Sequence, residues 1–340
     1  MSNISLGVSV IICAYTEERW HKLVAAVKSI QQQSTPPQEI IVVIDHNAQL
    51  FERVRTHMPD IIAIENSEPQ GLSGARNSGI ALAREVIIAF LDDDAVAELD
   101  WLARLSRYCE NFQVLGVGGT SDPLWESKRP AWFPEEFYWV VGCSYRGLPD
   151  SLAKVRNPFG GCACYRREVF EVIGGFRSEI GRVGSLPMGC EETELCVRAK
   201  QQWPQKFFLY EPQAKIHHHV PSHRASWRYF FSRCYAEGLS KALLARYVGT
   251  KDTLAPERTY VFSILLNGAV HVAMYGFLRF DLISFLRAGA ILVGLLITIV
   301  GYIVGTISRY LALYKGVNTS DCYNFKQLLQ QKVGIGTPKR

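Results

Sequence analysis

The chain has 340 residues, enough for one large domain or two ordinary ones, and 48% of them are hydrophobic. Its net charge of +5 is mild and no lysine- and arginine-rich run forms a basic patch, so nucleic acid is not an expected partner, whereas an anionic substrate or lipid is compatible with the charge. The nine cysteines lack the paired spacing of a zinc site, which indicates reduced thiols in a cytosolic compartment. No secretory signal is expected, because the amino-terminal residues lack a charged region followed by an apolar one.

The first part of the chain alternates predicted strands with predicted helices. Continuous apolar runs predict buried strands, and apolar residues three and four positions apart predict helices. The strands are expected at residues 8–13, 39–44 and 61–64, and the helices at residues 23–30 and 50–57. Such alternation with short links is typical of an α/β fold, with a parallel sheet built from right-handed βαβ units.

A fourth predicted strand, residues 86–91, runs directly into Asp92, Asp93 and Asp94. In open α/β sheets ligands bind beyond the carboxyl ends of the strands, and the second strand also ends in an acid, Asp45. Adjacent carboxylates repel one another unless a positive charge lies among them, and a divalent cation takes oxygen ligands and can also hold a diphosphate. This edge is a candidate nucleotide site, with one acid for the base or ribose and another for a metal–diphosphate; an acidic turn that caps the next helix is the alternative.

A glycine-rich segment, residues 71–79, is expected to open the helix before that strand. It matches neither the dinucleotide-binding glycine motif nor the phosphate loop, so neither of those chemistries is indicated. Arg76, near the helix start, could face a phosphate, but taken alone it is more typical of a surface ion pair.

The middle of the chain is less regular. A helix over residues 99–112, a strand over 114–118 and a helix over Arg167–Ile173 are expected, and residues 157–165 are glycine-rich with no strand predicted. Residues 124–141 carry many aromatic side chains without helical or strand periodicity. Three interpretations of that stretch are open: an acceptor platform, a lipid contact, or core filling under a long loop.

Two clusters of ionisable residues follow. Glu191, Glu192 and Glu194 begin a helix, where acids are ordinary partners of the helix dipole, although a carboxylate there is also well placed to act as a base. Short strands are expected at residues 206–210 and 214–220, and the second holds three adjacent histidines. Because strand residues alternate in direction, His218 points opposite to its two neighbours, and one of the three could bind a metal or handle a proton.

Taken in order, these motifs resemble those of the family 2 glycosyltransferases, which have the GT-A nucleotide-sugar fold. The resemblance covers roughly residues 8–219 and rests on segments in the family's order: VSVIICAYTEE, IVVIDHN, GLSGARNSGI, FLDDD, GCEETEL and HHHVP. It implies a Rossmann-like mixed sheet flanked by helices, a nucleotide-diphosphate sugar as donor, and a divalent Mn or Mg ion as cofactor.

The resemblance also implies roles for individual residues. Glu192 falls on the catalytic base, which takes the proton from the acceptor hydroxyl, and Asp94 and His218 fall on metal ligands. Two departures stand out: the base position holds Glu where the family usually has Asp, and the Gln-x-x-Arg-Trp signature of processive members is absent. The residues implied to bind the nucleotide sugar are Ala14, Tyr15, Glu17, Asp45, Arg76, Asp92 and Asp93.

The implied activity is therefore an inverting, non-processive, metal-dependent transfer of one sugar, with a UDP-linked donor favoured. The acceptor would be a hydroxyl of a membrane-proximal glycan or lipid-linked acceptor, in polysaccharide or glycoconjugate biosynthesis. Two alternatives are a polyprenyl-phosphate glycosyltransferase, whose acceptor is a phosphate, and a non-catalytic GT-A-like scaffold that binds nucleotide or partner proteins. The intact acids at Asp92, Asp94 and Glu192 argue against the scaffold.

The last third of the chain predicts membrane association. Residues 223–244 mix aromatic and basic side chains, which favours an amphipathic helix at a membrane interface or packed on the catalytic domain. Residues 260–277 are a weak candidate span. Residues 288–306 carry no charge, and this stretch is close to the ~20 residues that a helix needs to cross a bilayer. A hairpin would keep the catalytic domain on the cytoplasmic side of the cell membrane, but Arg279 and Arg287 weigh against it, so a single span or a flat first segment is also open. The predicted divisions are 1–222 (catalytic domain), 223–252 (interface helix), 253–312 (membrane-associated helices) and 313–340 (basic cytoplasmic tail).

Overall fold

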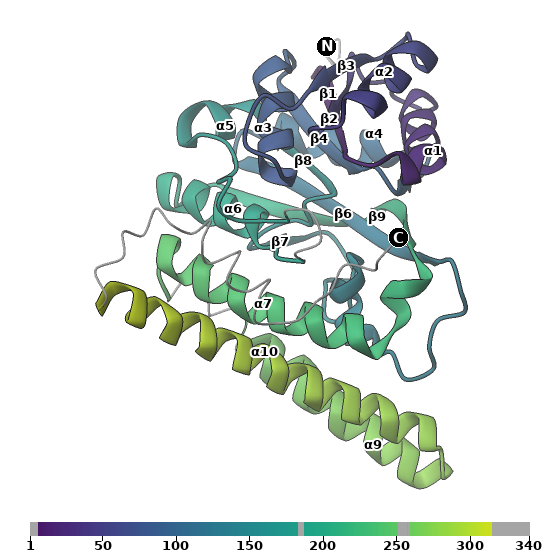
Figure 1. Cartoon of the computed structure of the whole chain (residues 1–340), viewed down its shortest axis with the longest axis vertical. Coiled ribbons are helices and arrows are strands. Elements are labelled where there is room, and N and C mark those ends of the chain that lie inside the picture. The colour runs from purple at the N-terminus through teal and green to yellow at the C-terminus, as the bar shows by residue number, and fades with distance from the viewer. Residues whose placement is uncertain (1–5, 183–186, 251–256, 258, 315–340) are drawn as a thin grey trace.

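The computed structural model describes residues 6–182, 187–250, 257 and 259–314. A mixed sheet runs in the order β3-β2-β1-β4-β8-β6-β9-β5, and β7 pairs with β9. Helices flank the sheet, and a further layer of helices lies beneath it (Figure 1). The strands are β1 (Val8–Ala14), β2 (Glu39–Ile44), β3 (Ile62–Glu65), β4 (Ile87–Asp92), β5 (Ala95–Ala97), β6 (Val114–Trp125), β7 (Ala153–Val155), β8 (Cys162–Arg166) and β9 (Phe207–Val220). The helices are α1 (Trp20–Gln31), α2 (Ala48–His57), α3 (Leu72–Leu82), α4 (Trp101–Ser106), α5 (Arg167–Ile173), α6 (Glu191–Gln202), α7 (Trp227–Val248), α9 (Asn267–Arg279) and α10 (Leu282–Tyr314), with short helical turns η1 (Glu17–Arg19), η2 (Arg107–Glu110), η3 (Glu135–Val141), η4 (Ser222–Ala225) and η5 (Tyr260–Leu266).

The amino-terminal half of the sheet is parallel, as the sequence predicts. β1 lies between β2 and β4, with Ala14 opposite Ile44 and Cys13 opposite Asp92, so the acids that follow β2 and β4 share one edge. Because successive strand residues point to opposite faces, the apolar runs bury both sides of the sheet at once. One face packs on α1, α2 and α4, and the other packs on α3, α5 and α6.

The other half makes the sheet mixed, as the resemblance implies, and departs only from the parallel pattern that the apolar runs predict. β8 inserts between β4 and β6 and runs antiparallel to both. Its five residues are all buried, but they directly follow two glycines, which concealed a strand within the glycine-rich segment. The two strands predicted at residues 206–210 and 214–220 are one strand, β9, because a register shift against β6 absorbs the residues between them. The helix predicted at residues 99–112 is shorter: α4 ends at Ser106 and the chain continues as the turn η2.

Helix α7 lies beneath the sheet, and α10 lies along the far side of α7 (Figure 1). Aromatic side chains from the segment before and within η3 fill this layer. Phe133 and Phe137 are buried against Phe230 of α7, and Trp132 stacks on Trp227 with 3.7 Å between ring centroids. Core filling is therefore the correct interpretation for these residues.

The last two helices form a hairpin, with α9 folded back against α10 (Figure 1). Tyr260–Arg279 and Leu282–Ser308 are each long and apolar enough to cross a membrane, on length and composition alone. The predicted basic tail, residues 313–340, lies outside the described residues from residue 315 onward.

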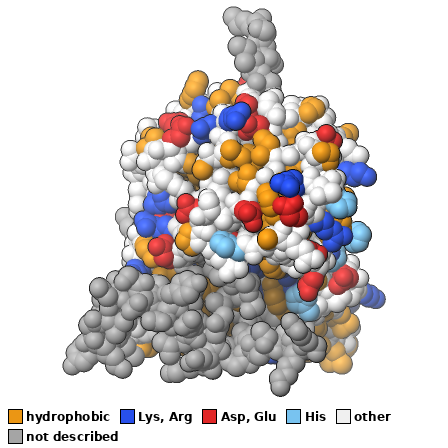
Figure 2. Space-filling view, turned by 45° about the horizontal axis from the view of Figure 1, so that its top comes forward, with side chains coloured by type: hydrophobic (Ala, Val, Ile, Leu, Met, Phe, Trp, Pro, Cys, Tyr) orange, Lys and Arg blue, Asp and Glu red, His pale blue; other side chains and the backbone are white. Residues whose placement is uncertain are grey.

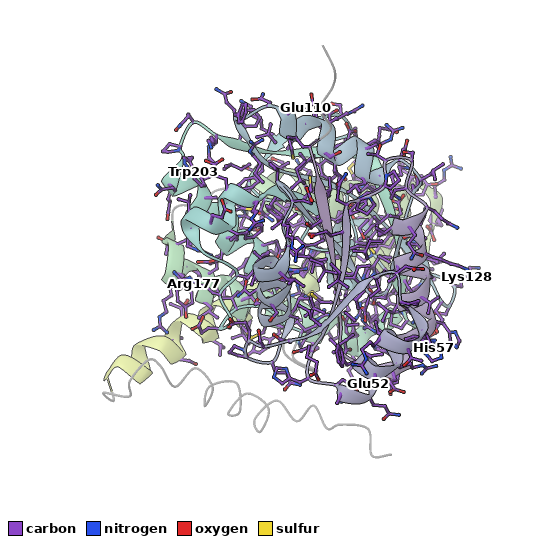
Figure 3. The ribbon with its side chains drawn as sticks, turned by 90° about the horizontal axis from the view of Figure 1, so that it is seen from above. Glu52, His57, Glu110, Lys128, Arg177 and Trp203 are labelled. Carbon is purple, nitrogen blue, oxygen red and sulfur yellow. The ribbon has the colours of Figure 1, made fainter. Side chains whose placement is uncertain are left out.

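Several charged side chains of the α/β part lie at its rim (Figure 3). Seen from above, Glu52, Glu110 and Lys128 sit at the periphery of the fold (Figure 3). On the face in Figure 2, acidic and basic side chains are interspersed, with hydrophobic side chains between them. Large exposed apolar side chains are concentrated instead on α9 and α10.

Candidate active site

The turn between β4 and β5 brings two aspartates against β9. In the β5–β9 pair, Ala95 lies opposite His218, and the His219 amide donates to the Asp94 carbonyl at 2.8 Å. One ligand atom each of Asp92, Asp94 and His218 therefore lies within 4.8 Å of the others. Two carboxylates and an imidazole supply the oxygen and nitrogen donors that Mn²⁺ accepts, so the cluster is able to hold a divalent ion.

His218 is fixed within this cluster from both sides of its ring. Its Nε2 lies 3.1 Å from Asp94 Oδ1, and its Nδ1 lies 3.9 Å from Cys143 Sγ. The backbone of Gly142, at a φ of 84°, comes so close that a Cβ there would lie 3.4 Å from the ring. Burial lowers the pKa of His218, but the charge and hydrogen bond of Asp94, together with Cys143, outweigh burial and raise that pKa well above its ordinary value. Among the three adjacent histidines, His218 is the buried one.

Arg19, which the sequence analysis missed, neutralises the acids on the other side. Its Nη1 lies 2.9 Å from Asp93 Oδ1 and 3.1 Å from Asp94 Oδ2. Burial raises the pKa of Asp93 to about 7, and Asp94 adds to that shift while Arg19 opposes it. Asp93 Oδ2 is buried without a hydrogen-bond partner among the described residues. The only signal for Arg19 was its place in the loop directly after the first strand.

Arg76 is buried, so its interpretation as a surface ion-pair residue is wrong. Only 3% of the residue is exposed, and its guanidinium lies 3.0 Å from Glu191 Oε1 and 3.8 Å from Asp92 Oδ1. Burial lowers the pKa of Arg76, but Glu191 and Asp92 more than compensate and raise it. Arg76 thus joins the start of α6 to the end of β4.

The two glutamates at the start of α6 differ in their surroundings. Both line a cavity, but Glu191 is buried and paired with Arg76, whereas Glu192 is half-buried and forms no ion pair with any described residue. Burial raises the pKa of Glu192 to about 8, Glu191 adds to the shift, and Arg76 opposes it. Glu192 is therefore the member of the pair that is free to exchange a proton near neutral pH.

The cavity, of about 640 Å³, joins the metal cluster to Glu192. Arg76, Asp92, Glu192 and His218 all line it, and it continues to α7, η5 and α10. Its wall also includes Gly161, where a Cβ would collide with the Asp92 carboxylate. The metal cluster and the proposed base therefore face one space, on the same side of the sheet.

The cavity is not lined by the other residues implied to bind the nucleotide: Ala14, Tyr15, Glu17, Asp45 and Asp93. Asp45 is held by its neighbours, because Oδ1 accepts from Asn66 Nδ2 at 2.7 Å and Oδ2 accepts from the Gly71 amide at 3.0 Å. Tyr15 is 45% exposed, next to the ends of β1 and β2. The guanidinium carbon of Arg19 lies 5.3 Å from the centroid of its ring.

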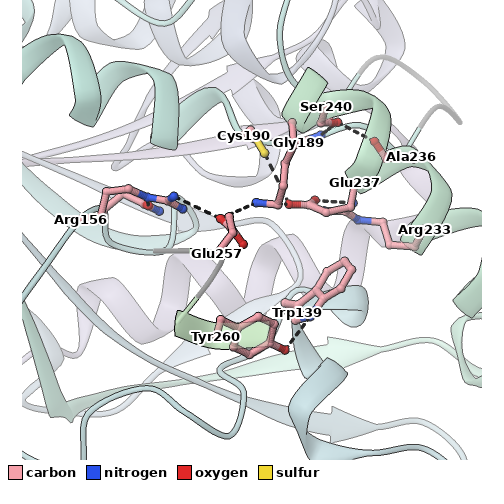
Figure 4. A network of polar contacts seen from close by, with 12 residues as sticks. Trp139, Arg156, Gly189, Cys190, Arg233, Ala236, Glu237, Ser240, Glu257 and Tyr260 are labelled. Carbon is pink, nitrogen blue, oxygen red and sulfur yellow. Dashed lines mark hydrogen bonds and ion pairs between the residues drawn. The ribbon is translucent and has the colours of Figure 1, made fainter. Parts of the chain in front are cut away.

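A buried ionic network lies on the α7 side of the cavity (Figure 4). Glu237 accepts from Arg233 at 2.8 Å and lies 3.0 Å from Lys241 Nζ, which also donates to Glu257 at 2.8 Å. The segment in front of α6 is tied to α7, because the Gly189 amide donates to Ser240 Oγ at 3.1 Å and the Cys190 thiol donates to Glu237 at 3.5 Å. Helix α7 thereby holds the chain segment that precedes Glu192 in place.

Comparison with known proteins places these observations in a family. A model of glycosyl transferase family 2 matches residues 9–174. The chain is 34% identical over 243 residues to the glucosyl-dolichyl phosphate glucuronosyltransferase of Haloferax volcanii, a match that covers 70% of this chain and 77% of that protein. It is 25% identical over 248 residues to the succinoglycan biosynthesis protein ExoM of Rhizobium meliloti, covering 70% of this chain and 75% of that one. Among solved structures, the mannosyltransferase PcManGT from Pyrobaculum calidifontis, in complex with GDP-Man and Mn²⁺, has the same fold, with a TM-score of 0.60, 17% identity and 88% of each chain covered.

Proposed function

From the premise that this chain belongs to glycosyl transferase family 2 and is a GT-A glycosyltransferase, we propose that it moves one sugar, with inversion, from a nucleotide-diphosphate sugar to a hydroxyl of a lipid-linked glycan at a membrane. The observation that carries the proposal is the shared cavity, in which the metal cluster and Glu192 face the same space. The Haloferax relative, by its name, acts on a glucosyl-dolichyl phosphate, which supports a lipid-linked acceptor.

On the donor side, Asp92, Asp94 and His218 would hold the divalent ion, and PcManGT, which carries Mn²⁺ in its complex, supports Mn²⁺ as that ion. When bound, the ion would neutralise the charge of the departing diphosphate. Arg19 keeps Asp93 and Asp94 in position through its two ion pairs. The loop and strand ends at Ala14, Tyr15, Glu17 and Asp45 would hold the nucleoside, which we take to be uridine.

Arg224 is a further candidate for contact with the diphosphate, and sequence reasoning did not identify it. The residue lines the cavity and is 5% exposed, and its Nε has no hydrogen-bond partner among the described residues. Burial raises the pKa of Asp94, but His218, Arg19 and Arg224 together hold it far below its usual value, so Arg224 lies close to the metal cluster. A buried guanidinium with spare donors beside such a cluster suits a phosphate.

On the acceptor side, Glu192 would accept the hydroxyl proton while the acceptor oxygen bonds to the anomeric carbon and the bond to the diphosphate oxygen breaks. One such displacement inverts the anomeric centre. A sugar hydroxyl needs a base, whereas a phosphate acceptor is already ionised at neutral pH. The raised pKa of Glu192, about 8, makes its carboxylate a stronger base than an ordinary one, which favours a hydroxyl over the polyprenyl-phosphate alternative.

Incubation of the purified protein with a panel of nucleotide sugars and polyprenyl-phosphate-linked mono- and disaccharides, with Mn²⁺ or EDTA, tests the proposal. Mass spectrometry should find one added sugar on a glycan-bearing lipid in Mn²⁺ and none in EDTA, and NMR of the product should show the opposite anomeric configuration from the donor. Transfer directly onto polyprenyl phosphate would replace this proposal with the phosphate-acceptor alternative. Nucleotide binding without turnover of any donor would favour the scaffold.

A further inference from the structure

The hairpin of α9 and α10 carries most of the large exposed apolar side chains of the described chain. They include Phe277 and Phe280 near its tip and Val293, Val300 and Ile307 along α10. Water-soluble monomers rarely expose so large a contiguous apolar surface. Something apolar must therefore cover it.

Helix α10 is held against the body of the protein near both ends. Near its start, Arg287 Nε donates to the Ala131 carbonyl at 2.6 Å. Further along, Gly294 packs on Phe137 and Phe230, and a Cβ at Gly301 would collide with the Tyr235 carbonyl of α7. These contacts recur on one face of α10, and the opposite face is the exposed apolar one.

The length of α10 that these contacts hold against the body of the protein decides whether the helix can cross a bilayer. From Arg287 to Gly301 is fourteen residues, or about 21 Å of helix, and the packing on α7 continues at Gly305, where a Cβ would lie 2.8 Å from Ala242. A hydrocarbon core is ~30 Å thick, so a helix that crossed it would draw α7 in alongside. The Arg233–Glu237–Lys241 network on α7 makes that position costly.

We propose that α9 and α10 lie in the plane of the membrane, within the leaflet that faces the catalytic domain, and do not cross it. The occupant of the apolar face is then the lipid of one leaflet. Arg279 and Arg287, which weighed against a spanning hairpin, can reach the head groups of that same leaflet with their charged ends. This inference does not depend on the sugar-transfer reaction.

The placement also gives the cavity a lipid-facing wall. Leu295, Ile299 and Tyr302 of α10 line the cavity, and Ile299 is 44% exposed. A lipid-linked acceptor could therefore keep its chain in the leaflet beside α10 while its polar head reaches Glu192. An acceptor would not need to leave the membrane to react.

Depth measurements on three positions of α10 test the proposal. Val293→Cys, Val300→Cys and Ile307→Cys lie seven residues apart on the exposed face, so successive labels are about 10 Å apart along the helix. In full-length protein reconstituted into phosphatidylcholine–phosphatidylglycerol vesicles, spin labels at the three sites should report the same shallow depth. The unsubstituted protein gives the background from native cysteines.

A depth that changes by about 10 Å from one label to the next would overturn the proposal in favour of a crossing helix. Labels that sense no lipid, with a dimer in light scattering, would overturn it in favour of a second copy of the chain as the occupant. Leu99→Cys, 64% exposed on the α/β part, is the aqueous control. Neither readout requires turnover, so a failed topology and a failed activity assignment stay distinguishable.

Discussion

The metal side and the base side of the cavity are held in place by different kinds of interaction. On the metal side, the pairing of β4 with β8 and of β5 with β9 sets the positions of Asp92, Asp94 and His218 through backbone hydrogen bonds. On the base side, Glu192 depends on side-chain contacts that link α6 to β4 and to α7, through Arg76 and Glu237.

The difference has a physical consequence. A backbone ladder keeps its geometry when one side chain changes, so a substitution on the metal side should remove a ligand and leave the fold intact. An ionic network sets both position and proton affinity, so a substitution on the base side should also change a pKa. Four substitutions test that distinction.

The largest loss is expected from Asp94→Asn. It removes one charge from the metal cluster while the β5–β9 pairing holds the backbone, so turnover should fall by about 10³-fold. Because that charge pairs with Arg19 and His218, the melting temperature at neutral pH should also fall, although the variant should still fold. Titration calorimetry with Mn²⁺ should show weakened binding. Asp122→Asn, at a carboxylate 41% exposed on β6, is the matched control and should leave both unchanged. Activity within tenfold of wild type at saturating Mn²⁺ would contradict the ligand assignment.

Glu192→Gln should lower turnover by about 10²–10³-fold and leave donor binding intact. Because the Glu192 pKa is raised to about 8, wild-type activity should climb with pH up to about 8, and the variant should lack that rise. Because the Glu192 pKa is higher in the folded state than its ordinary value of 4.5, ionisation of Glu192 destabilises the folded protein as the pH rises from 4.5 through 8. The variant should therefore melt higher than wild type at pH 9 and equally at pH 4, whereas Glu171→Gln, at an exposed carboxylate on α5, should change neither profile.

The same distinction explains how much of the site could be predicted from the sequence. Asp92 ends β4, whose apolar run is visible as a local pattern, Asp94 directly precedes β5, and His218 lies near the end of β9. The β5–β9 pairing brings them together. Arg19 and Arg224 carry no such local signal, since their importance comes from the acids and the cavity that the fold places beside them.

The fold shows the same limit. The parallel half followed from periodicity, because each strand there is a continuous apolar run. β8 was missed because Gly160 and Gly161 precede it, and those glycines are needed where the chain passes close to Arg76 and Asp92. The sequence signal for a loop was thus produced by the site itself.

Gly161→Ala should have an intermediate effect on the metal side. A Cβ at this position would collide with the Asp92 carboxylate, so the ligand must shift while its charge is kept. This shift of the Asp92 carboxylate is expected to lower turnover by roughly 10²-fold and to weaken Mn²⁺ binding, with the melting temperature close to wild type. Gly289→Ala, on α10 with nothing near its Cβ position, is the control. A normal Mn²⁺ affinity in the Gly161 variant would show that Asp92 is not a ligand.

The smallest effect on turnover, with a clear loss of stability, is expected from Glu237→Gln. Burial raises the pKa of Glu237, but Lys241 and Arg233 outweigh it and lower that pKa to about 2. Its charge therefore stabilises the fold above its ordinary pKa of 4.5, by roughly 3 kcal/mol at neutral pH, and this contribution is lost as pH falls toward 2. The melting temperature of the variant should lie below wild type at pH 7 and converge with it in acid, whereas Glu52→Gln, at a carboxylate 58% exposed on α2, should not differ at either pH.

Because the charge of Glu237 also raises the pKa of Glu192, the pH at which activity reaches half its maximum should move down in the Glu237→Gln variant. A lower melting temperature with an unchanged pH profile would mean that α7 holds α6 in position without setting the proton affinity of the base.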